Sequence, residues 1–103
     1  MTIEETTQQF WLASEKKRAC RVVLEREPLP RIVWPLGIAS TSKNHIVLVC
    51  WQTAGFTKAG RKAGYRHLQL DRVIEIEMLD IHFQTPPDFN PIDGQYKDWV
   101  YHV

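Results

Sequence analysis

The sequence predicts a mainly β fold, a small and strongly curved sheet that closes toward a barrel and carries one N-terminal helix. Three observations support this prediction. Short β-branched segments alternate with tight turns from residue 20 onward, and only residues 3–18 have the end signals of a helix. The length, 103 residues with 44% apolar side chains, suits one domain with a single modest core.

The helix is expected over residues 3–18. Thr2 can cap its first turn, and Glu5 stands three residues later in the position of a capping box. Its last turn would then hold three cations near the negative end of the helix dipole, namely Lys16, Lys17 and Arg18. Apolar side chains are sparse along this segment, so we expect a short helix that covers one end of the sheet.

Three strands are predicted at residues 20–24, 31–39 and 45–51. Two prolines lie in the turn after the first of them, and proline cannot donate a hydrogen bond to a neighbouring strand. The third segment is β-branched and apolar throughout. That pattern is typical of a central strand covered on both faces.

Residues 52–64 contain three glycines and are predicted to form a loop. Residues 65–83 then alternate, with apolar side chains at the even positions Leu68, Leu70, Ile74, Ile76 and Met78. Nineteen residues are too many for an ordinary strand, so we expect a turn or bulge at residues 70–72. Residues 88–103 carry large side chains that are expected to dock back onto the sheet: Phe89, Ile92, Tyr96, Trp99 and Tyr101.

The formal net charge of +1 conceals an uneven distribution. Residues 43–72 carry six basic side chains against Asp71 alone, whereas residues 73–103 carry six acidic side chains against Lys97 alone. An anion would be drawn to the basic segment. The alternative is that the opposite charges neutralise one another across one small surface.

Arg66 and Arg72 share the even positions with the apolar side chains of residues 68–76. An arginine that points with core side chains is costly unless it meets an anion or reaches solvent. Two such guanidinium groups can converge at a barrel mouth and bind a phosphate or carboxylate. Two alternatives stay open: the turn reverses the register, or Asp71 or Glu75 pairs with the arginines.

A second group of cations, Lys58, Arg61 and Lys62, lies between Trp51 and Tyr65. Basic residues interleaved with aromatic rings can follow a nucleic-acid backbone while the bases stack on the rings. These residues are therefore candidates for ligand binding, with Trp51 and Tyr65 as the stacking pair. The alternative is a solvated loop without a ligand.

Several function classes are disfavoured. The four histidines lack metal-binding spacing, and two cysteines cannot form a four-thiolate zinc site. No nucleophile elbow, phosphate loop or dinucleotide fingerprint occurs. We therefore expect no catalytic residue, metal or cofactor, and a protein that is not an enzyme. No apolar run is long enough for a membrane span and no secretory signal is visible, so we expect a cytoplasmic protein without a membrane partner.

Two stretches together resemble the WYL domain, a module of bacterial transcription regulators. Residues 31–37 (RIVWPLG) are similar to the family segment Arg-x-Val-x-Pro-x-x, and residues 66–73 (RHLQLDRV) to Arg-x-Phe-x-Leu-x-Arg-Ile. The second segment has Leu68 in place of Phe and Val73 in place of Ile. Residues 46–48 (IVL) occupy the place of the Trp-Tyr-Leu triplet, of which only the leucine matches.

The resemblance implies an Sm-like or SH3-like barrel of about five strands over residues 18–90. Residues 1–17 would form the preceding helix, and residues 91–103 a C-terminal tail packed on the barrel. It also implies a non-enzymatic role in transcription regulation, in which a basic pocket senses a nucleotide-like ligand or single-stranded nucleic acid. Carried over by position, that pocket consists of Arg31, Arg66 and Arg72.

Regulators of this type usually carry a helix-turn-helix domain before the barrel, and the residues before the first strand are too few for one. The expected protein partner is therefore a DNA-binding regulator or a second copy of the chain, unless the chain is a fragment of a longer regulator. Two alternatives remain. One is an interaction or oligomerisation domain that uses the tail rings Phe89, Tyr96, Trp99 and Tyr101. The other is an Sm-like RNA-binding subunit without switching.

Overall fold

The computed structural model describes residues 1–57, 60 and 62–103. The fold is mainly β and barrel-like, as predicted, with one N-terminal helix. The elements follow in the order α1 (Ile3–Glu15), β1 (Arg18–Leu24), β2 (Arg31–Thr41), β3 (Ile46–Gly55), β4 (Gly64–Gln69), the 3-10 turn η1 (Leu70–Arg72), β5 (Val73–His82) and β6 (Tyr96–His102).

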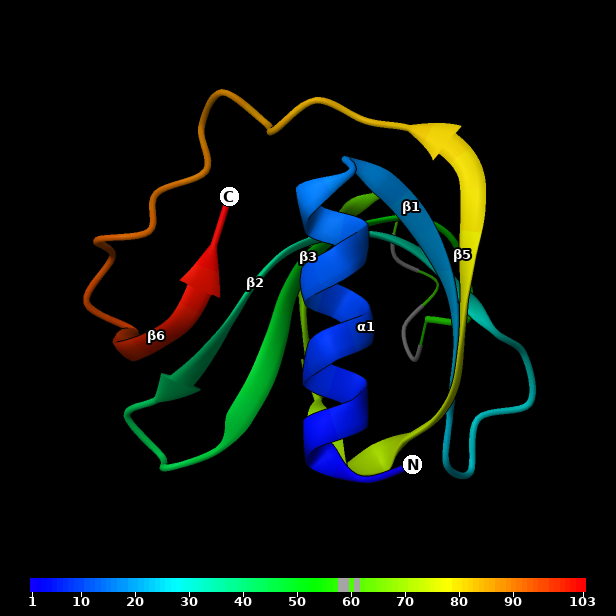
Figure 1. Cartoon of the computed structure of the whole chain (residues 1–103), viewed down its shortest axis with the longest axis horizontal. Coiled ribbons are helices and arrows are strands. Elements are labelled where there is room, and N and C mark those ends of the chain that lie inside the picture. The colour runs from blue at the N-terminus through cyan, green and yellow to red at the C-terminus, as the bar shows by residue number, and fades with distance from the viewer. Residues whose placement is uncertain (58–59, 61) are drawn as a thin grey trace.

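The strands form one antiparallel sheet in the order β4-β3-β2-β1-β5, and β6 pairs with the second half of β2. The sheet curves strongly, and α1 lies across its concave face (Figure 1). β2 changes partners along its length, from β1 at Arg31–Val33 to β6 at Gly37–Thr41. Pro35 lies between these stretches, and its carbonyl accepts a 2.9 Å hydrogen bond from the Ser14 hydroxyl of α1. The helix thus closes the gap where the sheet divides.

Apolar side chains cover both faces of β2 and β3. The main core lies on the side of α1 and includes Phe10, Ala13, Cys20, Val22, Leu24, Val33, Ile38, Leu48, Cys50, Leu68, Leu70 and Val73. The opposite face carries Ala39, Val47 and Val49, which are covered by Phe89, Tyr96 and Trp99. The prediction that residues 45–51 form a strand covered on both faces is therefore confirmed for β3.

The start of α1 is as predicted and its end is not. Both bonds of the capping box between Thr2 and Glu5 are present. The helix ends at Glu15, however, because Lys17 takes a left-handed conformation with φ 53° and Arg18 already begins β1. The basic side chains expected in the last turn therefore lie beyond it.

The break expected in residues 65–83 is confirmed, since η1 occupies Leu70–Arg72. Beyond it the even-position rule fails at one residue, since Val73 is buried and Ile74 is 51% exposed, whereas Ile76 and Met78 pack against the core as predicted. The pairs Leu24–Val73 and Val23–Glu75 leave Ile74 as an extra residue in a β-bulge, which shifts the alternation by one position. Two further segments have regular structure that was not expected. β3 continues to Gly55, into the predicted loop, and the tail forms a sixth strand.

Candidate functional site: an aromatic pocket beside β4

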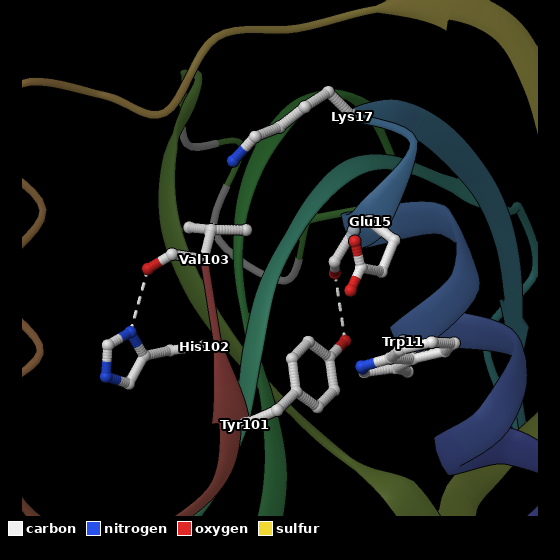
Figure 2. Close-up of a pocket in the computed structure, with 7 residues that line it drawn as sticks. Trp11, Glu15, Lys17, Tyr101, His102 and Val103 are labelled. Carbon is white, nitrogen blue, oxygen red and sulfur yellow. Dashed lines mark hydrogen bonds between the residues drawn. The ribbon is translucent and has the colours of Figure 1, made fainter.

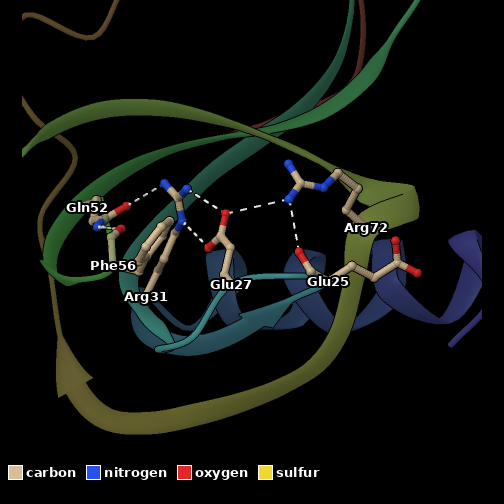
Figure 3. A network of polar contacts seen from close by, with 6 residues as sticks. All are labelled: Glu25, Glu27, Arg31, Gln52, Phe56 and Arg72. Atoms are coloured by element: carbon tan, nitrogen blue, oxygen red, sulfur yellow. Dashed lines mark hydrogen bonds and ion pairs between the residues drawn. The ribbon is translucent and has the colours of Figure 1, made fainter. Parts of the chain in front are cut away.

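Arg31 is buried and fully engaged within the protein (Figure 3). Its Nε and Nη2 donate to the two carboxylate oxygens of Glu27 at 2.9 and 2.8 Å, and its Nη1 donates to Gln52 Oε1 at 3.1 Å. Gln52 in turn donates to the carbonyl of Phe56, whose ring lies 5.6 Å from the guanidinium carbon. A carboxylate of the protein thus occupies the bidentate face that a ligand anion would need.

Arg72 lies beside the same carboxylate. Its Nη2 is 3.8 Å from Glu27 Oε2 and donates to the Glu25 carbonyl at 3.0 Å. The Glu27 side chain is only 3% exposed, so two arginines share one buried carboxylate. The structure therefore brings Arg31 and Arg72 together, through a residue that the sequence analysis did not single out. The spacing of four residues between Glu27 and Arg31 is the signal that was available for it.

Arg66 is not part of that network. Its Nη1 donates to the Tyr65 carbonyl at 2.9 Å and its Nη2 to the Lys62 carbonyl at 2.7 Å. The guanidinium thus stays beside the backbone at the start of β4. Lys62 is exposed, whereas Lys58 and Arg61 lie outside the described residues.

The two predicted stacking residues are neighbours, but they belong to a longer row of rings. The Trp51 and Tyr65 rings meet edge to face, with centroids 5.0 Å apart. Trp34 stacks on Trp51 at 6.4 Å and on Phe83 at 5.5 Å. Trp51 is therefore held between two rings of the protein itself, and Tyr65 is the member of the pair that faces the C-terminal segment.

Beyond Tyr65 the rings surround a hollow. Tyr65 and His67 lie on one face of β4, because they are two residues apart in a strand. From Tyr65 the centroids continue to Phe89 at 6.5 Å, from there to Trp99 at 6.0 Å, then to Tyr96 at 4.8 Å and back to His67 at 5.5 Å. We call these five residues the aromatic box.

The pocket at the aromatic box has a volume of about 530 Å³. Its walls come from β4 on one side and from the segment between β5 and β6 on the other. Two sequence-predicted site residues line it, Tyr65 and Arg66, and the others were not predicted as site residues. Among the described residues, the lining consists of Tyr65, Arg66, His67, Asp88, Phe89, Asn90, Asp93, Gln95 and Tyr96.

Two hydrogen bonds join β4 to the C-terminal part of the chain, and a third lies within that part. The Tyr65 hydroxyl donates to Asp88 Oδ1 at 2.6 Å, and His67 Nε2 lies 3.2 Å from the Tyr96 hydroxyl. The indole of Trp99 donates to the Pro91 carbonyl at 2.7 Å. The segment after β5 has no regular structure, yet the first bond ties it to β4, the second ties β6 to β4, and the third ties the segment to β6.

The protonation states in the pocket follow from this packing. Burial raises the pKa of Tyr65, and the bond to Asp88 raises it further, so the hydroxyl keeps its proton. Burial lowers the pKa of His67 below 6.5, so its ring is neutral at pH 7. Asp88 and Asp93 are then the anions of the lining, and Arg66 is its cation.

Two other hollows lie at α1. One lies between the end of α1 and β6 and has a volume of about 180 Å³; Figure 2 shows Tyr101 and Trp11 on its walls. The Tyr101 hydroxyl there is already bonded to Ser14 at 2.9 Å. The other, about 550 Å³, lies along the exposed side of α1 at Glu5, Gln8, Gln9, Trp11 and Leu12.

The cysteines offer no reactive thiol. Burial raises the pKa of both Cys20 and Cys50 to about 12, and nearby guanidinium groups offset this only in part. Both thiols therefore stay protonated at neutral pH. Within the described part of the chain, no three His, Cys, Asp or Glu side chains gather as a metal site would require.

The chain matches no protein-family model, and comparisons with curated proteins and with solved structures find no similar protein. Among the described residues, no helix has the length and apolar character needed to cross a bilayer.

Proposed function

We propose that this chain is a non-enzymatic sensing module whose small-molecule ligand occupies the aromatic pocket. The observation that carries the proposal is the aromatic box: four of its five rings line one hollow of about 530 Å³. Small-molecule sites commonly measure about 300–1,000 Å³ and combine apolar walls with a few polar groups. Here the polar groups of the described lining residues are two carboxylates, two amides, two hydroxyls, one guanidinium and one imidazole.

The sequence-predicted pocket is less well supported than the aromatic pocket. It consists of Arg31, Arg66 and Arg72. A phosphate at Arg31 would have to displace Glu27, which is buried and makes two short hydrogen bonds to the guanidinium. Removing one partner of such a pair leaves a charge in a poorly solvated place. We therefore assign Arg31 and Arg72 to stability, and we place the ligand beside Tyr65 and Arg66.

The regulatory part of the proposal rests on the resemblance to the WYL domain, which implies a cytoplasmic sensor that acts on a DNA-binding regulator or on a second copy. One feature of the pocket suits a sensor. Half of its wall belongs to the segment that leads into β6, so an occupied pocket would hold that segment and β6 more firmly. A partner that contacts β6 would then respond to the ligand.

The test is a thermal-shift screen of nucleosides, nucleotides, short single-stranded oligonucleotides and small amines. A ligand should raise the melting temperature of the wild type and of Arg72→Ala, and should have no effect on Phe89→Ala. The matched control is Ile81→Ala, which removes a half-exposed side chain from β5. Binding that is lost in Arg72→Ala but kept in Phe89→Ala would reject the pocket as the site.

A second candidate function is protein interaction through α1. The tail rings that were expected to meet a partner pack against β2 and β3 of their own chain. The helix, in contrast, exposes Ile3, Trp11 (47%) and Leu12 on its surface. Light scattering after size exclusion tests this candidate: Trp11→Glu should dissociate any dimer, and a dimer that persists in the variant excludes α1 as its interface.

A further inference from the structure

Aromatic side chains and polar side chains line the pocket together. Tyr65, His67, Phe89 and Tyr96 line the hollow, and Trp99 contacts both Phe89 and Tyr96 from outside the lining. Each ring face carries partial negative charge, and a cation within about 6 Å of a ring centroid is attracted to it. Several rings around one hollow therefore favour a ligand with a diffuse positive charge.

The charged groups of the lining point the same way. Asp88, Asp93 and Arg66 are the charged side chains among the described lining residues, whose formal charges sum to −1 with a neutral His67. The Arg66 guanidinium donates to two backbone carbonyls, of Tyr65 and Lys62, which already solvate its charge. A phosphate entering this pocket would meet two carboxylates, whereas an organic cation would be attracted by both.

The carboxylates of Asp88 and Asp93 are each held by one hydrogen bond to Oδ1. Asp88 Oδ1 accepts the Tyr65 hydroxyl, and Asp93 Oδ1 accepts the backbone N–H of Gln95 at 3.0 Å. Neither of these two bonds involves the Oδ2 atom of its aspartate. The two aspartates are thus fixed by the fold, and a carboxylate has lone pairs for more than one hydrogen bond.

Within the proposed function, we propose that the ligand of the aromatic pocket is a small molecule that carries a methylated ammonium group. A primary ammonium holds its water strongly and needs several hydrogen-bond acceptors, whereas a methylated one is bulky and weakly hydrated. Attraction to aromatic rings and to carboxylate charge does not require an N–H donor, so this lining suits the methylated form best. The pocket is larger than such a headgroup, so it also has room for the carbon chain that bears it.

The experiment compares choline with 3,3-dimethyl-1-butanol, which has the same shape but a carbon in place of the charged nitrogen. NMR titration of the wild type should show choline shifting the resonances of Tyr65, His67 and Tyr96. The neutral compound should bind about ten-fold more weakly or worse, because it lacks the charge. Adenosine and AMP are titrated as a third set of probes. A peptide with trimethyllysine is the fourth probe, and it distinguishes a modified protein from a free metabolite as the ligand.

Two variants test the groups that carry the inference. Asp88→Asn removes the charge but keeps an oxygen for the Tyr65 hydroxyl, and it should weaken choline binding several-fold. Phe89→Leu removes a ring face and should do the same. Asp98→Asn is the matched control, because Asp98 lies on β6 outside the lining and the change should leave the affinity unaltered.

The outcomes separate the inference from the proposed function. Equal affinity for choline and its neutral analogue would overturn the inference, as would adenosine or AMP shifting these resonances when choline does not; in both cases a ligand pocket remains. If no probe shifts the resonances of the aromatic box, the inference and the proposed function both fail. The isostere comparison needs no variant, so it decides even if Phe89→Leu does not fold.

Discussion

The Tyr65 hydroxyl donates a 2.6 Å hydrogen bond to Asp88 Oδ1, and this bond ties β4 to a segment with no regular structure. This segment lies beside the face of β4 that carries Tyr65 and His67. A second contact, between His67 and Tyr96, joins the same two walls. The pocket therefore exists because the C-terminal part of the chain returns to β4.

Replacing Tyr65 by phenylalanine removes the hydroxyl and keeps the ring. Because the bond is partly exposed to solvent, we expect Tyr65→Phe to lower the free energy of unfolding by about 1 kcal/mol. Urea denaturation measures the change. Ser40→Ala is the control, since its hydroxyl makes only a 3.5 Å contact and its loss should cost little. A change at Tyr65 no larger than that at Ser40 contradicts the role given to this bond.

The pairing of Arg31 with Glu27 makes a strong prediction about stability. Arg31→Met leaves a buried carboxylate with only Arg72 beside it, and we expect a loss of about 3–5 kcal/mol. Replacing both residues together, with Glu27→Gln added, should cost less than the sum of the two single changes.

The exposed pair of Arg21 and Glu75, 3.9 Å apart, is the control for this cycle, and Arg21→Met should cost no more than about 1 kcal/mol. The coupling energy follows from chemical denaturation of the wild type, the two single variants at Arg31 and Glu27, and the double variant. If Arg31→Met is as stable as the wild type, Arg31 is not the structural residue described above.

His67 predicts a specific dependence of stability on pH. Burial lowers its pKa in the folded protein below the unfolded value of about 6.5, so on acidification the unfolded chain takes up a proton first. This contribution to stability is present above pH ~6.5 and is lost as the pH falls toward the folded pKa. Between about pH 7.5 and about pH 5.5, His67→Gln should therefore lose less stability than the wild type.

The control for this pH dependence is His82→Gln on β5, because that residue is exposed. Thermal unfolding over the pH series measures all three proteins. Parallel curves for the wild type and His67→Gln would show that burial of this ring does not govern its protonation.

Gly37 is required where β6 lies against β2. A Cβ at this position would come within 2.6 Å of both Trp99 Cζ3 and the Tyr101 carbonyl oxygen. Gly37→Ala should therefore displace β6 and cost about 1–3 kcal/mol. Gly94→Ala is the matched control, because no atom lies within 4 Å of its Cβ position. Circular dichroism with urea checks both, and equal stability of the two variants contradicts the tight packing of β6.

Much of the fold could be predicted from local pattern. The capping residues of α1, the apolar run of β3 and the break at η1 are all encoded within a few neighbouring residues. The bulge at Ile74 could not be predicted, because it arises from pairing with β1 rather than from the sequence of β5 itself. β6 was missed for a similar reason, since its register depends on the second half of β2.

The candidate site was harder to predict, because it is assembled from distant segments. Tyr65 and Arg66 were recognised as candidates, but Asp88, Phe89 and Tyr96 reach the pocket only through the fold of the tail. The arginines misled in a different way: a guanidinium among core positions, such as that of Arg72, signals an anion, and here that anion is the Glu27 carboxylate, which also binds Arg31. Sequence alone does not distinguish a partner within the protein from a ligand.

The most direct test of the central claim is an NMR map of where a ligand binds, with choline as the probe on the full chain. We predict that the largest shifts fall on Tyr65, His67, Phe89 and Tyr96, and that the Nε–H resonances of Arg31 and Arg72 do not move. Shifts centred on Arg31 and Arg72, with the aromatic box unchanged, would contradict the assignment of the pocket as the ligand site.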